Sequence, residues 1–569
     1  MKTNKFYKYE DIVLINYSRV FPKNEIEILK SEAFKIILND YYNYLKKFKP
    51  VLFSYLVQNK KLSKNTIIKN YTSFLLSCLI NDYKQINSYY TKDNSLCLEL
   101  FENLYNFYRE KLRIGFVYQP SYSVNGMNFI DVDNNFNKLM LSFYRNIEEK
   151  IKGKSNVIYR QLNAGTNGCG VISFVKWNYG EFEFLQKINF ITSLMLRTPL
   201  FLKTNSNKRV GSFKETSVNI FESFKNSENI DDWLCYPIKI NSNLGFIYFH
   251  RDFVFNAIGL SNLFEIAKVE EYTNKKPDLI LFFGMQDVSL NNSYYYDSNS
   301  ETYFGCISHQ KQNDYFGYMK KMILTLHNLS NIQKGILPVH GSMITIKLKN
   351  KKPKNIVFMG DSGTGKSETI EMLNIIGKNK IEKMDVIFDD MGSFENNGNN
   401  ILASGTEIGA FLRLDDLEKE TQFKNIDRSI FYNADKNLNA RVIIPVNTFE
   451  NISKKYSVDM FLYANNYDDK TGIQKFESIQ EAKNVFCDGK RFAIGTTNEV
   501  GITKSFFANP FGCVQKQSET ETIIDNIFEI MFAKKVYVGQ IFTKLGIKND
   551  NNKGLKESAN LLLKLIEKL

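Results

Sequence analysis

Residues 355–367 read Asn-Ile-Val-Phe-Met-Gly-Asp-Ser-Gly-Thr-Gly-Lys-Ser, an apolar run that ends in a loop rich in glycine. The apolar run predicts a buried strand, and the loop carries glycines at positions 360, 363 and 365. Because glycine has no Cβ, successive backbone N–H groups can turn inward around a polyphosphate without steric hindrance. The stretch therefore predicts a phosphate-binding loop between a strand and a helix; the alternative is an ordinary glycine turn.

The residues that follow the last glycine have the chemistry that a bound nucleotide requires. Lys366 supplies a positive charge for the β- and γ-phosphates, and Ser367 supplies a hydroxyl for the accompanying Mg²⁺. The predicted helix from Glu368 to Ile376 points the positive end of its dipole at the same anion. These features predict that the chain binds ATP or GTP.

Length and composition predict a globular protein of two or three domains, because 569 residues that are 43% hydrophobic can bury a large core. Lys plus Arg exceed Asp plus Glu by 74 − 61 = 13, but the basic residues are interspersed and no recognition-helix or zinc-finger pattern accompanies them. Nucleic-acid binding is therefore not expected, and the charge instead fits anionic small substrates.

The sequence has no apolar stretch near the ~20 residues that a membrane span requires, and its amino terminus lacks the apolar core of a signal peptide. Seven scattered cysteines without a Cys-x-x-Cys pair indicate neither a disulfide framework nor a zinc ribbon. We therefore expect a cytoplasmic protein without membrane association; the sequence assigns no oligomeric state.

The sequence divides into three regions that differ in hydrophobic periodicity and composition. Residues 1–113 are predicted to be mostly helical, with apolar and aromatic residues at three- and four-residue spacing over 26–56, 67–79 and 96–112. Residues 114–333 alternate short β-like runs with glycine, asparagine and serine clusters, which predicts a mixed α/β domain on the substrate side. Residues 334–569 contain the phosphate loop among short strands and end in an amphipathic helix over 554–569. The predicted fold class is α/β.

A second candidate feature is the segment Met384-Asp-Val-Ile-Phe-Asp-Asp390, a predicted strand that ends in two carboxylates. Open α/β sheets place ligands at such strand ends, and paired aspartates suit one or two divalent metals beside a triphosphate. The alternative is that Asp389 and Asp390 only cap a turn.

Two further features are weak by themselves. His340 lies ahead of the phosphate loop in Gly335-Ile-Leu-Pro-Val-His, and a lone histidine is more often structural than a ligand. The segment Tyr315-Phe-Gly-Tyr-Met-Lys-Lys321 ends in two lysines, which ordinarily form a solvated helix face.

The order and spacing of these motifs resemble the ATP-type phosphoenolpyruvate carboxykinase family. Tyr-x-Gly-x-Met-Lys-Lys is followed by a histidine nineteen residues after the second lysine (340 − 321), then by Ser-Gly-Thr-Gly-Lys-Ser, Asp-Asp and Asn439-Ala-Arg-Val-Ile-Ile-Pro445. The segment Lys276-Pro-Asp-Leu-Ile-Leu is also similar to that family's Lys-Pro-Asp strand. The resemblance covers residues 276–446 and implies a carboxykinase-like nucleotide-binding domain over 334–569.

The resemblance implies roles for individual residues. Lys321, His340 and Asp390 would hold a catalytic Mn²⁺, with the Lys321 amine neutral, and Ser367 and Asp389 would hold the Mg²⁺ that accompanies ATP. Ser362 would contact the transferred group, Arg441 would neutralise charge at the γ-phosphate, and Arg197 in Arg-Thr-Pro is the nearest match to the family's substrate arginine. The full set of implied nucleotide contacts is Gly360, Asp361, Ser362, Gly363, Thr364, Gly365, Lys366, Ser367, Glu368 and Arg441.

The reaction that the resemblance implies converts oxaloacetate and ATP to phosphoenolpyruvate, CO₂ and ADP, so the partners would be a nucleotide and a small-molecule carboxylate. A second hypothesis keeps the phosphotransfer site but gives it another small-molecule or protein acceptor. A third is a non-catalytic ATP-binding protein. One residue is unusual in all three, because Asp361 is an acid beside the predicted phosphate site and is expected to turn away from it.

Overall fold

A computed structural model describes residues 6–19, 21–58, 61–120, 128–177, 180–414, 425–434, 439–493, 501–547 and 552–568. The chain is a mixed α/β protein, as the sequence predicts, and it divides into two compact units. Unit 1 comprises residues 1–175 and 189–197, and unit 2 comprises residues 176–188 and 198–569. Within the described ranges, no helix has both the length and the apolar character to cross a membrane.

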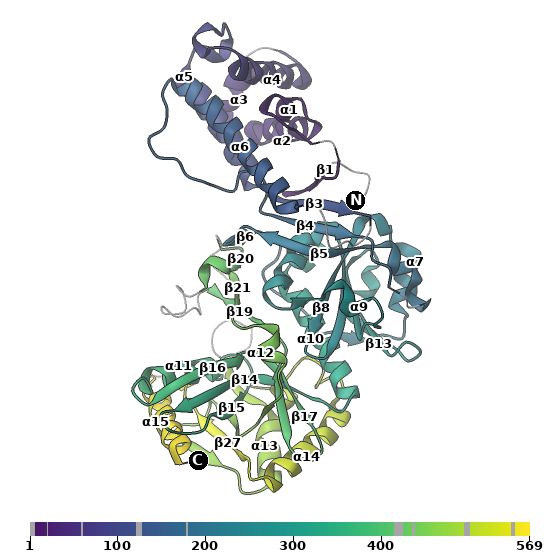
Figure 1. The fold of residues 1–569 in the computed structure, drawn as a ribbon, viewed down its shortest axis with the longest axis vertical. Helices are drawn as coiled ribbons and strands as arrows, with labels where there is room; N and C mark the ends of the chain where they lie inside the picture. Colours follow the sequence, from purple (N-terminus) through teal and green to yellow (C-terminus); the bar gives the residue numbers. More distant parts are fainter. Residues whose placement is uncertain are drawn as a thin grey trace. The chain divides into compact units, whose positions relative to one another are not determined.

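Unit 1 combines a group of helices with a strand layer (Figure 1). The strands run in the order β1, β2, β3, β4, β5, with parallel pairing of β2 with β3 and of β3 with β4. The elements are β1 (Phe6–Tyr9), β2 (Ile12–Asn16), α1 (Glu25–Lys30), α2 (Glu32–Phe48), α3 (Pro50–Val57), α4 (Lys64–Ile80), α5 (Asn94–Glu110), β3 (Leu112–Gln119), α6 (Phe129–Lys152), β4 (Gly168–Ser173) and β5 (Asn189–Leu196).

A capping side chain precedes α1, α2, α4, α5 and α6 of unit 1, whereas no side chain caps α3. The Ser31 hydroxyl accepts a hydrogen bond from the Phe34 N–H at the start of α2, and Asp93 does the same for Leu96 at the start of α5. Helices α1 to α5 confirm the helical periodicity of the amino-terminal region. The prediction missed β1 and β2, which pair with each other, while β2 also pairs with β3. The expected domain boundary after residue 113 therefore falls inside a strand.

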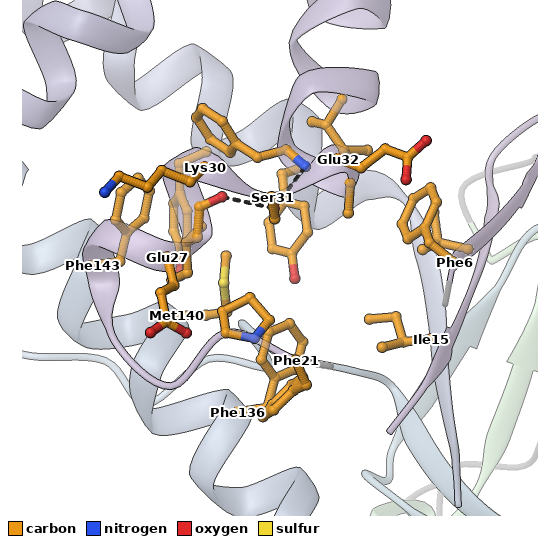
Figure 2. A pocket seen from close by; sticks show the side chains of 18 of the residues that line it. Phe6, Ile15, Phe21, Glu27, Lys30, Ser31, Glu32, Phe136, Met140 and Phe143 are labelled. Carbon is orange, nitrogen blue, oxygen red and sulfur yellow. Dashed lines mark hydrogen bonds between the residues drawn. The ribbon is translucent and has the colours of Figure 1, made fainter. Parts of the chain in front are cut away.

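Several aromatic residues of unit 1 line a cavity of about 460 Å³ (Figure 2). Phe21, Phe136 and Phe143 contribute apolar walls, and Glu27, Lys30 and Glu32 are exposed residues of its lining. The sequence interpretation of these aromatic residues as core holds for most of them, since α2, α4, α5 and α6 share one buried cluster.

Unit 2 begins with a mixed sheet in the order β8, β9, β11, β13, β12, β7, to which β10 adds at β8. Strands β9, β11 and β13 are parallel, and α10 packs on β13 and β11. The elements are β6 (Leu200–Leu202), β7 (Lys214–Glu215), α7 (Ile220–Ser227), β8 (Trp233–Ile240), β9 (Asn243–His250), α8 (Val254–Gly259), β10 (Glu265–Ile266), α9 (Val269–Tyr272), β11 (Leu279–Met285), β12 (Ser293–Asp297), β13 (Thr302–Ser308) and α10 (Phe316–Gln333).

The rest of unit 2 contains a second sheet in the order β22, β18, β17, β14, β15, β23, β27, β24, with β16 on β14, and a smaller sheet β19, β21, β20, β6. Because α10 contacts β14 as well as β13, both sides of the expected boundary at residue 333 belong to unit 2. The elements are β14 (Leu337–Leu348), β15 (Lys354–Met359), α11 (Lys366–Ile376), β16 (Ile381–Phe388), β17 (Met391–Asn396), β18 (Ile401–Gly405), β19 (Gly409–Arg413), β20 (Ile430–Tyr432), β21 (Arg441–Pro445), α12 (Phe449–Ser453), β22 (Tyr456–Ser457), β23 (Met460–Asn465), β24 (Ile473–Lys475), α13 (Ile479–Asp488), β25 (Lys490–Ala493), β26 (Gly501–Lys504), α14 (Gln517–Ala533), β27 (Tyr537–Phe542) and α15 (Lys553–Lys568).

His327 on α10 is a fully buried structural histidine. The Asn243 amide donates to its Nδ1 at 3.0 Å, and the Lys334 ammonium donates to the Asn243 oxygen at 2.7 Å, which fixes the amide orientation. Burial, together with the charge of Lys334, lowers the pKa of His327 from 6.5 to about 3. The folded protein therefore keeps this imidazole neutral where the unfolded chain protonates it.

We predict that His327 makes the protein acid-sensitive. Between pH 6.5 and pH 3 the unfolded state binds a proton that the folded state does not, so stability falls as pH falls through this window. From pH 6.5 to pH 4 the loss from this group is about 3 kcal/mol. Denaturant unfolding at both pH values, in the wild type and in His327→Gln, isolates the contribution. An equal pH dependence in the two proteins would contradict it.

Candidate functional site

The glycine-rich loop connects the carboxyl end of β15, an inner strand of the second sheet, to the start of α11 (Figure 1). Gly363 and Gly365 have left-handed backbones with φ of 78° and 97°, and a Cβ on Gly365 would lie 2.8 Å from Thr543. No side chain caps the start of α11, so the first-turn N–H groups have no side-chain acceptor. The Lys366 ammonium is buried at the loop and donates to the carbonyl oxygens of Gly360 at 2.7 Å and Asp361 at 3.1 Å. The strand, loop and helix are those that a phosphate-binding loop requires.

Asp361 is held by an arginine from a distant part of the chain. The Arg491 Nε lies 2.9 Å from its Oδ2, and the Arg491 NH1 donates to the Ser362 carbonyl at 2.8 Å. The Ser362 N–H also donates to Asp361 Oδ1 at 2.7 Å. Arg491 therefore neutralises the one acid in the loop and fixes the backbone of the loop.

We predict that Arg491→Ala weakens ATP binding by about 10-fold or more, because an unpaired Asp361 would repel the phosphates. Calorimetric titration with ATP measures the effect. Adding Asp361→Asn to Arg491→Ala removes the repelling charge and is expected to restore most of the affinity. A double variant that binds ATP as weakly as the single variant would contradict this account.

The strand register places His340 beside the loop. β14 pairs antiparallel with β15, with Gly341 opposite Met359, and the Gly360 N–H donates to the His340 carbonyl at 3.1 Å. The His340 Nδ1 lies 2.8 Å from the Ala508 carbonyl oxygen, so this nitrogen carries a proton and Nε2 is the ring nitrogen that faces the site. That Nε2 lies 3.1 Å from Asp390 Oδ1.

The two aspartates after β16 contact different parts of the site. Asp389 Oδ1 accepts hydrogen bonds from the Ser342 hydroxyl at 2.9 Å and from the Ser367 hydroxyl of α11 at 3.0 Å. Asp390 instead faces His340. Burial raises the pKa of Asp389 in spite of its two serine partners. The carboxylate pair thus joins the phosphate loop on one side to the histidine on the other.

Lys320, which the sequence interpretation left as part of a solvated helix face, is the lysine that contacts Asp390. Its ammonium lies 2.7 Å from Asp390 Oδ2 and 3.1 Å from Glu407 Oε1, and both Lys320 and Glu407 are buried. Burial acts to raise the pKa of Asp390, but the charge of Lys320 and the hydrogen bond from His340 outweigh it and hold that pKa well below its usual value. Burial raises the pKa of Glu407 to about 7.

Lys321 has the electrostatic character that the metal-ligand hypothesis requires. Burial lowers its pKa to about 8, and the positive charges of Arg209, Lys320 and Arg441 act in the same direction. Its Nζ lies 5.7 Å from the centre of the Phe511 ring, whose centre lies 6.3 Å from that of His340. The Lys321 amine therefore loses its proton more readily than an ordinary lysine, although Lys320 makes the direct contact with Asp390.

Arg441 and Arg209 add further positive charge around Lys321. Arg441 is the first residue of β21, and its guanidinium lies over the Phe411 ring at 5.4 Å, the same ring that the Lys320 ammonium approaches at 5.7 Å. Arg209 precedes Val210, whose N–H donates to the Tyr318 hydroxyl of α10 at 3.0 Å. In both arginines the buried Nε has no hydrogen-bond partner among the described residues. The positive charges of Arg209, Arg441 and Lys321 would together favour an anion here.

Arg197 lies in unit 1, whereas the other predicted site residues lie in unit 2. Its NH2 forms an ion pair with the buried Asp133 and donates to Asn134 Oδ1 at 3.0 Å. Asp133 also accepts from the hydroxyls of Tyr17 and Thr166. Within unit 1, Arg197 therefore has a structural role.

The structure thus brings together the loop residues, His340, Asp389 and Asp390. Lys321 lies close enough to both Asp390 and Arg441 for their charges to act on it. Ser362 and Ser367 are exposed at the loop, and Glu368 lies in the first turn of α11. The sequence analysis missed Lys320, Glu407, Arg209 and Arg491. Only Lys320 had a local signal, as the partner of Lys321 in a lysine pair.

No protein-family model matches this sequence, and no curated protein matches it.

Proposed function

We propose that the chain is an ATP-dependent phosphotransferase that resembles phosphoenolpyruvate carboxykinase. The observation that supports it most is the carboxylate pair after β16, in which Asp389 contacts Ser367 at 3.0 Å and Asp390 contacts His340 at 3.1 Å. The candidate nucleotide site and the candidate metal site would therefore be adjacent, as transfer of a phosphoryl group to a metal-bound acceptor requires.

The donor chemistry of the site fits the proposed metals. His340 Nε2 lies 3.1 Å from an oxygen of Asp390, and a neutral imidazole beside this carboxylate would offer a cation one nitrogen and one oxygen ligand. His340, Asp390 and the neutral amine of Lys321 would hold Mn²⁺, and Ser367 with Asp389 would hold the Mg²⁺ of ATP. A Mn²⁺ ion bound there would supply Lewis acidity for an enolate oxygen.

The chain's own residues supply binding and charge. Lys366 and the uncapped N-terminus of α11 would hold the β- and γ-phosphates, while Arg491 neutralises the charge of Asp361. Arg441 would neutralise charge at the transferred group. The unpartnered Nε groups of Arg209 and Arg441 support an anionic acceptor such as a carboxylate.

The proposed substrate is oxaloacetate, with phosphoenolpyruvate, CO₂ and ADP as products. ³¹P NMR of the protein with ATP, Mg²⁺, Mn²⁺ and oxaloacetate tests it, and we expect the resonances of ADP and phosphoenolpyruvate to grow together. ADP formation that does not depend on oxaloacetate would contradict this substrate.

All seven cysteines are unpaired in the structure, which supports action in the reducing cytoplasm.

We predict that Arg209→Ala lowers kcat/KM for the anionic acceptor by about 10- to 100-fold, the value of a hydrogen bond to a charged group. ATP affinity should stay within about twofold, because the charged cluster of Arg209 adjoins Lys321 and not the phosphate loop. Steady-state kinetics and ATP titration measure both quantities. The exposed neighbour Lys208, changed to alanine, is the matched control. Equal kinetics in the two variants would remove Arg209 from the site.

A second candidate is a kinase of the same design with a different acceptor. It is favoured by the ion pair of Arg197 with Asp133, because the residue nearest to the family's substrate arginine already has a partner in unit 1. ATP turnover that needs another small molecule or a protein hydroxyl, and that is lost in Lys366→Ala, would support it.

A further inference from the structure

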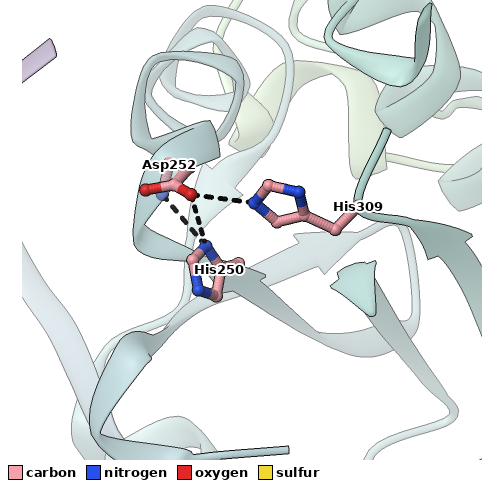
Figure 3. Close-up of side chains that lie close together, drawn as sticks. All are labelled: His250, Asp252 and His309. Carbon is pink, nitrogen blue, oxygen red and sulfur yellow. Dashed lines mark hydrogen bonds and ion pairs between the residues drawn. The ribbon is translucent and has the colours of Figure 1, made fainter. Parts of the chain in front are cut away.

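Two histidines and an aspartate converge at the carboxyl ends of two strands, β9 and β13, in the first sheet of unit 2 (Figure 3). His250 ends β9, Asp252 follows it by two residues, and His309 directly follows β13. The Asp252 Oδ2 lies 3.2 Å from His250 Nδ1 and 2.8 Å from His309 Nε2. His250 and Asp252 are buried, and the side chain of His309 is 18% exposed. None of these three residues takes part in the contacts described above for the phosphate-loop site.

The strand β11, which lies between His250 and His309, leaves room for the two side chains to meet. β11 lies between β9 and β13 and is parallel to both, with a register shift at Gly284. Gly284 has a left-handed backbone with φ of 106°, and a Cβ there would lie 2.8 Å from the Cβ of His250 and from the Phe253 ring. Any larger residue would displace His250. The glycine therefore allows the rings of His250 and His309 to approach to 4.9 Å between their centres.

The three ligand atoms of the cluster meet at one carboxylate oxygen. Asp252 Oδ2 lies 2.8 Å from His309 Nε2 and 3.2 Å from His250 Nδ1. All three ligand atoms lie within 4.8 Å of one another, so one ion could take the place of the protons between them.

We propose that His250, Asp252 and His309 form a binding site for a divalent transition-metal ion of the Zn²⁺ type. Two imidazoles and one carboxylate are borderline ligands that suit Zn²⁺ and disfavour Mg²⁺ and Ca²⁺, which prefer oxygen ligands. Ligands at about 2.0–2.1 Å from a tetrahedral ion lie about 3.3 Å apart, close to the 2.8 and 3.2 Å separations of the donor atoms. Three ligands leave a position open for water or a small ligand.

A further carboxylate balances the charge of this site. A divalent ion with two neutral imidazoles and Asp252 leaves one positive charge. Glu228 Oε1 accepts from the Gln286 N–H at 2.7 Å, just past the end of β11. The His309 N–H donates to the carbonyl of the residue before Gln286, Met285, at 2.6 Å, so this carboxylate is held close to the cluster. The neighbouring cation Arg251 forms an ion pair with Asp232, in which NH1 lies 2.8 Å from Oδ1, so its charge has a carboxylate partner outside the cluster.

Titration of the metal-free full-length protein with Zn²⁺, in the background of His340→Ala, tests the proposal. That variant removes the histidine of the other candidate metal site, so we expect one equivalent of Zn²⁺ to bind. Adding His309→Gln or Asp252→Asn should weaken this binding by about 100-fold or more, because each removes a direct ligand. An excess of Mg²⁺ should not compete with Zn²⁺ for this site.

Co²⁺ gives a second readout in the wild type that does not depend on the folding of a ligand variant. Bound to imidazole nitrogen, Co²⁺ should show visible d–d bands that persist in His340→Ala and that Zn²⁺ abolishes. Absence of Zn²⁺ binding in His340→Ala, or equal Zn²⁺ affinity after Asp252→Asn in a variant with wild-type circular dichroism, would overturn the proposal. Failure of phosphoryl transfer would not affect it.

Discussion

Asp390→Asn is expected to lower the rate of phosphoryl transfer by about 1,000-fold or more, because metal-assisted charge stabilisation is worth several kcal/mol and each 1.36 kcal/mol is a factor of ten. The carboxylate has two partners, His340 Nε2 at 3.1 Å and the Lys320 ammonium at 2.7 Å. Asparagine has the same shape but lacks the charge that a metal requires. Lys320 keeps its ion pair with the buried Glu407, so the fold should be retained.

Steady-state turnover at saturating ATP and Mn²⁺ measures this loss, with circular dichroism to verify the fold. Asp385→Asn is the matched control, because Asp385 lies on the same strand β16 and forms an ion pair with the exposed Lys383. Turnover of Asp390→Asn within about tenfold of the wild type would contradict a role for Asp390 in metal binding.

Lys366→Ala is expected to weaken ATP binding by about 100-fold, because it removes charge-assisted hydrogen bonds worth about 1.5–3 kcal/mol each. The Lys366 ammonium lies within the loop, 2.7 Å from the Gly360 carbonyl, where it would meet the β- and γ-phosphates. Turnover should fall with binding, since the same charge acts on the transferred group.

Fluorescence titration with ATP and a turnover assay measure the two effects of Lys366→Ala. Lys378→Ala is the control, because Lys378 is exposed just beyond the other end of α11. Undiminished ATP affinity in Lys366→Ala would show that the loop does not hold the phosphates.

The strands and helices that carry the site could be predicted because their patterns are local. The apolar run before the glycines is β15, the run before the two aspartates is β16, and the stretch from Tyr315 to Leu329 lies almost entirely in α10. The predicted amphipathic helix at the carboxyl end is α15. Each of these segments has its own periodicity or its own terminating residues.

The partners that complete the site come from distant parts of the chain and leave no such pattern. Arg491 reaches the loop over 129 residues to contact Ser362, and Glu407 meets Lys320 only because β19 and α10 fold to the same place. The choice between Lys320 and Lys321 depends on which face of α10 packs inward, and a lysine pair does not encode that. The unit boundaries were also unpredictable, since β3 follows a helical region directly and then pairs with β2.

Anomalous X-ray diffraction at the manganese edge, from crystals grown with ATP and Mn²⁺, tests the adjacency of nucleotide and metal sites most directly. The account predicts one manganese peak bound by His340 Nε2, Asp390 and Lys321, and a second between Ser367, Asp389 and the phosphates. A nucleotide bound at the loop with no manganese at His340 would contradict it.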